Sequence, residues 1–304
     1  MSHAKLYVIG NGFDLHHKMQ TRYSDFRKFV EQEDHEILTL IENYVSERDG
    51  ISENDWANLE SALGEIDCDL IIDDCSVFLQ SYGAEDWSDS GHHDFQYEVG
   101  RIADGLSFKL RGLFARWIRT IQIPKLDDLS NKLSTLDKNG LYLNFNYTST
   151  LTSIYLIPAE NILYIHGEAN MKDTELVIGH ARDPAEIESL NDPNLIEEQD
   201  SRETEGYAII DDYFDKTFKQ SEKIIQENNL FFSKLSEIEE IIVLGHSLSD
   251  VDWSYLGALV DATNPTTRWT VACRNEDEML DKSAAVAKLN VPNYLIETVA
   301  WSSL

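Results

Sequence analysis

The segment Lys5–Leu15, which reads KLYVIGNGFDL, is the part of the sequence that decides the fold. An apolar, β-branched run at residues 5–9 leads directly into a turn that contains Gly10 and Gly12. Such a turn lets backbone N–H groups approach a phosphate closely at the N-terminus of a helix. The third glycine of the dinucleotide-binding fingerprint is missing, so an ordinary tight turn between a strand and a helix stays open as the alternative.

Short apolar segments recur along the chain and are separated by stretches with helical periodicity. Further strands are expected at residues 141–145, 162–165, 176–178, 241–244, 269–273 and 294–296. Buried strands that alternate with helices form mostly parallel sheets with both faces covered. The pattern therefore predicts an α/β, Rossmann-like fold.

The expected strands also divide the chain into domains. We expect residues 1–33 and 140–304 to form a nucleotide-binding core, and residues 34–139, which are apolar at helical spacing, to form a large helical insertion. The acidic, aperiodic stretch 183–206 is predicted to be a loop, and a helix is expected around residues 213–236.

Composition narrows the classes of function and the compartment. With 55 acidic and 25 basic residues, the formal net charge is -30, which argues against nucleic acid as a partner because such binding depends on Lys and Arg that neutralise phosphates. No apolar run is long enough to cross a bilayer, and Met1 is followed by a strand pattern rather than a signal peptide. Three cysteines without metal-ligand spacing fit a reducing environment. We therefore expect a cytoplasmic protein that binds a small ligand and no membrane.

Four of the expected strands end in polar, turn-forming residues. These clusters are Gly10–Gly12, Asn144–Thr148, His166–Glu168 and Gly245–Ser247. Ligands of open parallel sheets bind beyond the carboxyl ends of the strands, so the four clusters are expected to line one edge.

The same motifs resemble a known family. Those that carry the resemblance are Gly10–Leu15, Tyr23–Phe26, Trp56–Glu60, Asn144–Thr148, Ile165–Gly167 and Leu244–Ser247. In this order they are similar to AbiH, a family of phage abortive-infection proteins. The resemblance implies a role in bacterial defence against phage.

A more distant resemblance, to the sirtuin-like NAD-binding fold, implies the chemistry. In that fold a glycine turn cradles NAD, an asparagine follows a mid-chain strand, and a catalytic histidine–glycine pair follows the next. The positions that match are Gly10 and Gly12, Asn146, His166 with Gly167, and Gly245 with Ser247. The sequence departs from the pattern at Asn11, Asp14 and Thr148, and it has no four-cysteine zinc module. These departures argue against protein deacetylation and leave NAD cleavage.

Hydrolysis of the nicotinamide–ribose bond is compatible with these residues. His166 is the candidate base, since imidazole titrates at about 6.5, and Asn146 is the candidate that holds the attacking water. Asp14 could bond a ribose hydroxyl or stabilise the cationic sugar. The full set of expected NAD-binding residues is Gly10, Asn11, Gly12, Phe13, Asp14, Thr148, Gly167, Gly245 and Ser247. No metal is expected.

Structural roles and other functions remain as alternatives. His166 could cap a turn, Asn146 could form an Asx turn, and Asp252 could start a helix. The main alternative function is that of a non-enzymatic nucleotide sensor or a partner-binding defence protein. Two candidate partners remain open, a second copy of the chain and a phage-derived trigger. A nuclease fits the charge poorly. An α/β-hydrolase with Ser247 as nucleophile lacks the glycine two residues later, where Ser249 stands.

Overall fold

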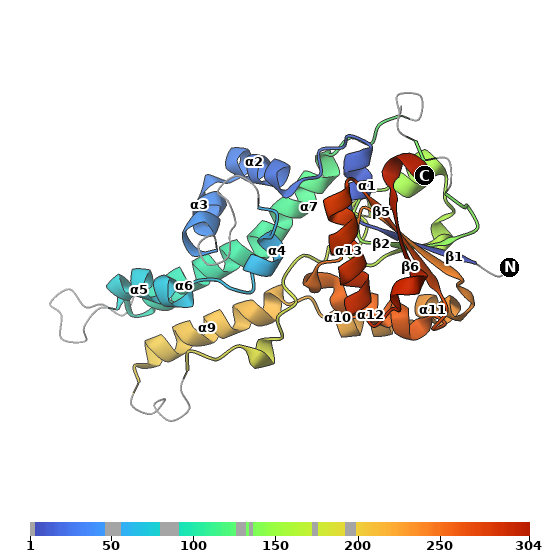
Figure 1. Cartoon of the computed structure of the whole chain (residues 1–304). Coiled ribbons are helices and arrows are strands. Elements are labelled where there is room, and N and C mark those ends of the chain that lie inside the picture. Colours follow the sequence, from blue (N-terminus) through green and yellow to red (C-terminus); the bar gives the residue numbers. More distant parts are fainter. Residues whose placement is uncertain are drawn as a thin grey trace. The chain divides into compact units, whose positions relative to one another are not determined.

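The computed structural model describes residues 4–45, 56–79, 91–125, 132–133, 136–171, 176–191 and 199–304. The chain forms two compact units (Figure 1). The first, here called the α/β unit, comprises Met1–Arg22, Trp117–Val177 and Gln220–Leu304. The second, here called the helical unit, comprises Tyr23–Arg116 and Ile178–Lys219. The helical unit therefore begins earlier than the predicted insertion, and it also takes in Ile178–Lys219, which the sequence had assigned to the core.

The α/β unit is built on one six-stranded sheet in which every pairing is parallel. Its strands are β1 (Lys5–Ile9), β2 (Leu141–Asn144), β3 (Ile162–Tyr164), β4 (Glu240–Leu244), β5 (Arg268–Cys273) and β6 (Ile296–Ala300). They lie in the order β3-β2-β1-β4-β5-β6, with β1 at the centre between β2 and β4. The predicted Rossmann-like α/β fold is thus confirmed.

Alternate residues of each strand point to opposite faces of this sheet, and helices cover both faces. Leu6 and Val8 join a core with α10 (Ser221–Glu227), α11 (Asn229–Phe232), α12 (Trp253–Ala262) and α13 (Glu276–Lys288). Tyr7 and Ile9 join the other core with α1 (Asn11–His16), α8 (Thr150–Tyr155) and the C-terminal turn. Continuous apolar strands are what a sheet buried on both faces requires.

The helical unit contains α2 (Tyr23–Glu33), α3 (His35–Tyr44), α4 (Leu59–Ala62), α5 (Cys68–Cys75), α6 (Asp94–Asp104) and α9 (Ser201–Thr217). A π-helical segment, Gly105–Lys109, joins α6 to α7 (Leu110–Thr120), and α7 passes from this unit into the α/β unit. α6 and α9 run alongside each other (Figure 1), and the ring of Phe95 occupies the space left by Gly206.

Three local predictions are wrong. Residues 176–178 form no strand, because Val177 N–H donates to the His166 carbonyl (3.0 Å) rather than to a ladder. Ser201–Thr217 is helical where a loop had been expected up to residue 206, since the Asp200 side chain accepts from Arg202 N–H and caps α9. The helix expected at 213–236 is broken into the end of α9, α10 and α11. Residues 192–198 of the predicted loop lie outside the described part of the chain.

Candidate functional site

The four polar clusters follow four neighbouring strands, β3, β2, β1 and β4. Since these strands are parallel, their carboxyl ends meet at one edge, as the sequence predicted. We call the loops at this edge, Gly10–Asp14, Phe145–Thr150, Ile165–Gly167 and Gly245–Asp252, the edge site. The strand order reverses between β1 and β4, and this switch point is where dinucleotides bind in doubly wound sheets.

The glycine turn after β1 is pressed against the loop after β4. A Cβ on Gly12 would lie 2.7 Å from the Gly245 Cα, and one on Gly10 would lie 2.8 Å from the Gly245 carbonyl oxygen. Gly245 has a φ of +71°, which favours glycine, and its carbonyl accepts from Gly12 N–H at 2.8 Å. The turn therefore uses its glycines to admit another stretch of backbone, and the N–H of Gly12 is engaged within the protein.

Asp14 is the buried centre of the edge site. Its side chain is 1% exposed, and its two oxygens accept hydrogen bonds from Thr148 Oγ1 (2.6 Å) and Thr150 Oγ1 (2.7 Å). Burial raises the pKa of Asp14 to about 6, against the opposing effect of hydrogen bonds from Thr148, Thr150 and Asn146. Asp14 and Thr148, both predicted ligand contacts, thus tie α1 to the loop after β2.

Asn146 connects the loops after β1 and β2. Its Nδ2 donates to the Gly10 carbonyl at 3.1 Å, and its backbone N–H donates to Asn144 Oδ1 at 3.1 Å. The second contact is an Asx turn made by the Asn144 side chain, whereas the sequence had offered an Asx turn made by Asn146 itself as the structural alternative. The first holds the glycine turn in place from the neighbouring strand.

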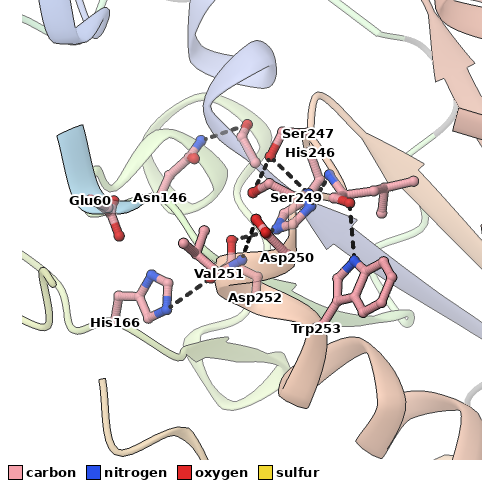
Figure 2. A network of polar contacts seen from close by, with 12 residues as sticks. Glu60, Asn146, His166, His246, Ser247, Ser249, Asp250, Val251, Asp252 and Trp253 are labelled. Atoms are coloured by element: carbon pink, nitrogen blue, oxygen red, sulfur yellow. Dashed lines mark hydrogen bonds and ion pairs between the residues drawn. The ribbon is translucent and has the colours of Figure 1, made fainter. Parts of the chain in front are cut away.

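His166 and His246 lie on either side of Asp252 (Figure 2). His166 Nε2 is 3.7 Å from Asp252 Oδ1, and His246 Nε2 is 3.3 Å from Asp252 Oδ2. All three residues are buried, with exposed fractions of 4%, 2% and 8% for His166, His246 and Asp252. The Phe145 ring contacts both imidazoles, with centroid distances of 5.3 and 4.3 Å. The result is a desolvated pair of bases around one carboxylate.

The remaining predicted residues are distributed between core and surface. Phe13 is fully buried and packs against Tyr155, so its side chain belongs to the core. Asn11 is exposed, and its Nδ2 donates to the Thr21 carbonyl at 2.7 Å. Ser247 is exposed and its hydroxyl lies 3.1 Å from that of Ser249. Gly167, with a φ of +90°, turns the chain after His166.

Sequence reasoning missed His246, Asp252 and Thr150. His246 was visible in the fourth cluster, but only its neighbours Gly245 and Ser247 were given a role. Asp252 had been interpreted as a helix-starting acid, and no sequence signal distinguishes that role from a contact with two distant histidines. Among the described residues, no group of three or more His, Cys, Asp or Glu side chains is placed to hold a metal ion.

A family model described as "Bacteriophage abortive infection AbiH" matches residues 6–273. The chain belongs to this family. The matched part of this AbiH chain contains all four loops of the edge site and ends at the last residue of β5. No curated protein and no solved structure matches it. In the part of the chain that the structure describes, no helix combines the length and apolar character needed to cross a bilayer.

Proposed function

We propose that this AbiH chain acts in phage abortive infection by binding NAD or a related nucleotide at the edge site and hydrolysing its nicotinamide–ribose bond. The observation that carries the proposal is the strand order, which reverses between β1 and β4 beside the glycine turn. A crevice at such a point suits a dinucleotide, because helices leave the two strands toward opposite faces of the sheet. Loss of NAD would deprive the infected cell of a central cofactor.

The edge site also holds the groups that this cleavage needs. Nicotinamide leaves as a neutral molecule with the electron pair of the broken C–N bond, so an acid is not required at the leaving group. Water supplies the new C–O bond to the ribose, and its proton passes to a base. His166 is the candidate for this base because it lies in the loop that follows β3 at the edge, and an unperturbed imidazole is neutral near physiological pH.

Exclusion of bulk water supports the same chemistry. Phe145 and Tyr255 surround the His166 ring, with centroid distances of 5.3 and 5.5 Å. Apolar surroundings strengthen electrostatic interactions with the cationic sugar that forms during bond breaking. Asn146 contributes by keeping the glycine turn in place through Gly10.

The test follows NAD and its products by mass spectrometry. Purified wild-type chain is incubated with NAD, and cells that express it are sampled before and after phage infection. We expect nicotinamide and ADP-ribose to accumulate, and turnover by His166→Ala to fall at least ~100-fold, the usual contribution of a general base. His35→Ala is the matched control, since His35 is an exposed histidine at the start of α3 in the helical unit.

Three outcomes would contradict parts of the proposal. Equal NAD loss with wild type and His166→Ala would reject His166 as the base, although NAD would still be consumed. Tight NAD binding by wild type, measured by calorimetry, without product in any sample would favour the nucleotide sensor instead. Absence of both binding and turnover would reject the proposal.

A further inference from the structure

Asp252 occupies a position where an aspartate side chain normally caps a helix, but the Asp252 side chain does not cap α12. It is the N-cap residue of α12, and its side chain makes no cap hydrogen bond. A capping Asp side chain normally accepts a hydrogen bond from a backbone N–H of the first helical turn. Its carboxylate points instead toward His166 and His246 (Figure 2). A local helix-starting role therefore does not account for the direction of this side chain.

The neighbouring Asp250 provides the contrast. It belongs to the same 3₁₀ turn, Asp250–Asp252, is exposed, and accepts a hydrogen bond from Val251 N–H at 3.1 Å. One acid of the pair thus serves the local backbone at the surface. The other is buried and contacts the ends of two different strands.

The hydrogen bonds of His246 fix where its proton lies. Leu248 N–H donates to His246 Nδ1 at 2.9 Å, so Nδ1 must carry a lone pair. His246 is therefore neutral, with its proton on Nε2, the atom that faces Asp252 Oδ2 at 3.3 Å. His246 donates to the carboxylate, and a backbone N–H keeps it in that tautomer. His166 is left as the imidazole of the pair that can take up a proton beside the carboxylate.

We infer that Asp252 is the positioning residue for His166, and that His246 in turn orients the Asp252 carboxylate. This inference rests on the proposed function and gives a residue outside the predicted site a role in it. When water attacks the ribose, its proton moves to His166, and the Asp252 carboxylate stabilises the resulting imidazolium. Asp252 itself takes no proton.

The distance between the two groups fits this role. At 3.7 Å, His166 Nε2 and Asp252 Oδ1 are beyond hydrogen-bond range but close enough to form an ion pair, which exists only when His166 is protonated. Other titratable groups that contact the His166 ring include Tyr147 and Tyr255, with centroid distances of 6.1 and 5.5 Å.

The kinetic test compares Asp252→Asn with Asp261→Asn in the full chain. Asp261 is an exposed acid near the end of α12 and lies outside the edge site. We expect Asp252→Asn to lower kcat for NAD hydrolysis about 100-fold with little change in KM, because the group stabilises a charge that appears only during reaction. We also expect the acid limb of the pH–rate profile to move about one unit toward lower pH, since removal of a nearby carboxylate favours neutral imidazole. Asp261→Asn should change neither quantity.

A second measurement does not depend on turnover. Nitrogen-15 NMR of the histidine rings reports tautomer and protonation, with signals assigned through His166→Gln and His246→Gln chains. We expect the neutral Nε2–H pattern for His246 in wild type. We expect Asp252→Asn to shift the His166 signal and lower the pH at which it titrates, and Asp261→Asn to leave it unchanged.

The two measurements separate the two hypotheses. If wild type does not hydrolyse NAD, the proposed function fails, while the NMR comparison still decides whether Asp252 controls His166. If Asp252→Asn does not fold, judged by circular dichroism, His246→Gln takes its place and should change the His166 signal by releasing Asp252. A His166 signal that titrates identically in wild type and in the folded variant would overturn the inference.

Discussion

Asp14 and Asp252 in the α/β unit and His180 in the helical unit are all buried, but their surroundings differ. In the α/β unit, Asp14 is bonded by threonine hydroxyls from a neighbouring loop, and Asp252 lies between two histidines. In the helical unit, His180 is 1% exposed and lies against the rings of Phe214 and Phe218. Within the described residues, neither ring nitrogen of His180 has a hydrogen-bond partner.

This difference shows that burial alone does not identify a functional site. Asp14 and Asp252 join loops that are distant in sequence, so their burial is coupled to the arrangement of the edge site. His180 is held neutral by its surroundings, because burial lowers its pKa to about 4 and its contacts with the backbone of Arg182 and Phe214 only partly oppose this. A neutral imidazole packed among rings contributes to the core and is poorly suited to exchange protons with a ligand.

The helical unit also contains a buried ion pair, and we expect its disruption to have the largest effect on stability. Lys219, whose side chain is 1% exposed, pairs with Glu60, which also accepts a hydrogen bond from Tyr23 Oη. Lys219→Met should lower the free energy of unfolding by roughly 3–5 kcal/mol, because it leaves a largely buried carboxylate without its cation. Urea denaturation followed by circular dichroism measures the change.

Two further variants separate the charge from the packing of the lysine chain. Lys216→Met removes a lysine whose pair with Asp212 is exposed, and it should cost at most about 0.5 kcal/mol. The double variant Lys219→Met/Glu60→Gln should recover most of the lost stability, since it removes both charges. Equal costs for the double and the single variant would show that the ion pair is not the cause.

His180 gives the next largest expected effect, and the effect depends on pH. Its pKa is about 4 in the folded chain against 6.5 unfolded, so the unfolded chain binds the proton first as pH falls. The stability from neutral His180 is complete above pH 6.5 and is lost as pH falls toward 4, by roughly 3 kcal/mol at about 1.4 kcal/mol per unit. As pH falls from 6.5 toward 4, the unfolding free energy of His180→Leu should therefore rise relative to that of wild type. A difference in unfolding free energy that stays constant with pH would contradict this.

The strands of the α/β unit could be predicted because their chemistry is local. Residues 6–9 and 241–244 are apolar throughout, as a sheet covered on both faces requires, and β1 and β4 occupy nearly these positions. The edge followed from the same reasoning, since the ends of parallel strands must lie together. Residues 176–178 are also apolar, but their backbone bonds to His166 rather than to a strand, and composition cannot reveal that choice.

The details of the edge site depended on contacts that sequence does not show. The glycine turn was predicted to approach a phosphate, and the group that it approaches in the structure is the backbone of Gly245 and His246. A phosphate cradle and a close approach to another stretch of backbone both need residues without a side chain, so Gly10 and Gly12 alone could not distinguish these two interpretations. The role of Asp252 depends likewise on the fold bringing His166 and His246 together from β3 and β4.

Asp14 should show a slightly smaller effect of opposite sign. Its pKa is raised from 3.8 to about 6, so the stability it provides is complete below pH 3.8 and is lost as pH rises to about 6, by roughly 3 kcal/mol. Asp14→Asn keeps the shape and can still bond Thr148 and Thr150, so relative to wild type it should gain stability as pH rises from 4 to 6. Asp250→Asn, an exposed acid of the same unit, should show no such trend.

If the chain unfolds as one cooperative system, the effects of Asp14 and His180 on the unfolding free energy nearly cancel between pH 4 and 6 in wild type. Each variant removes one of the two effects, so that the pH dependence caused by the other group can be measured. If the two units unfold separately, calorimetry should show two transitions, with Asp14→Asn altering the pH dependence of one and His180→Leu that of the other. A single transition whose pH dependence is changed by neither variant would show that neither Asp14 nor His180 affects the pH dependence of stability. A buried group with hydrogen-bond partners and a buried group packed among rings would then behave alike in this protein.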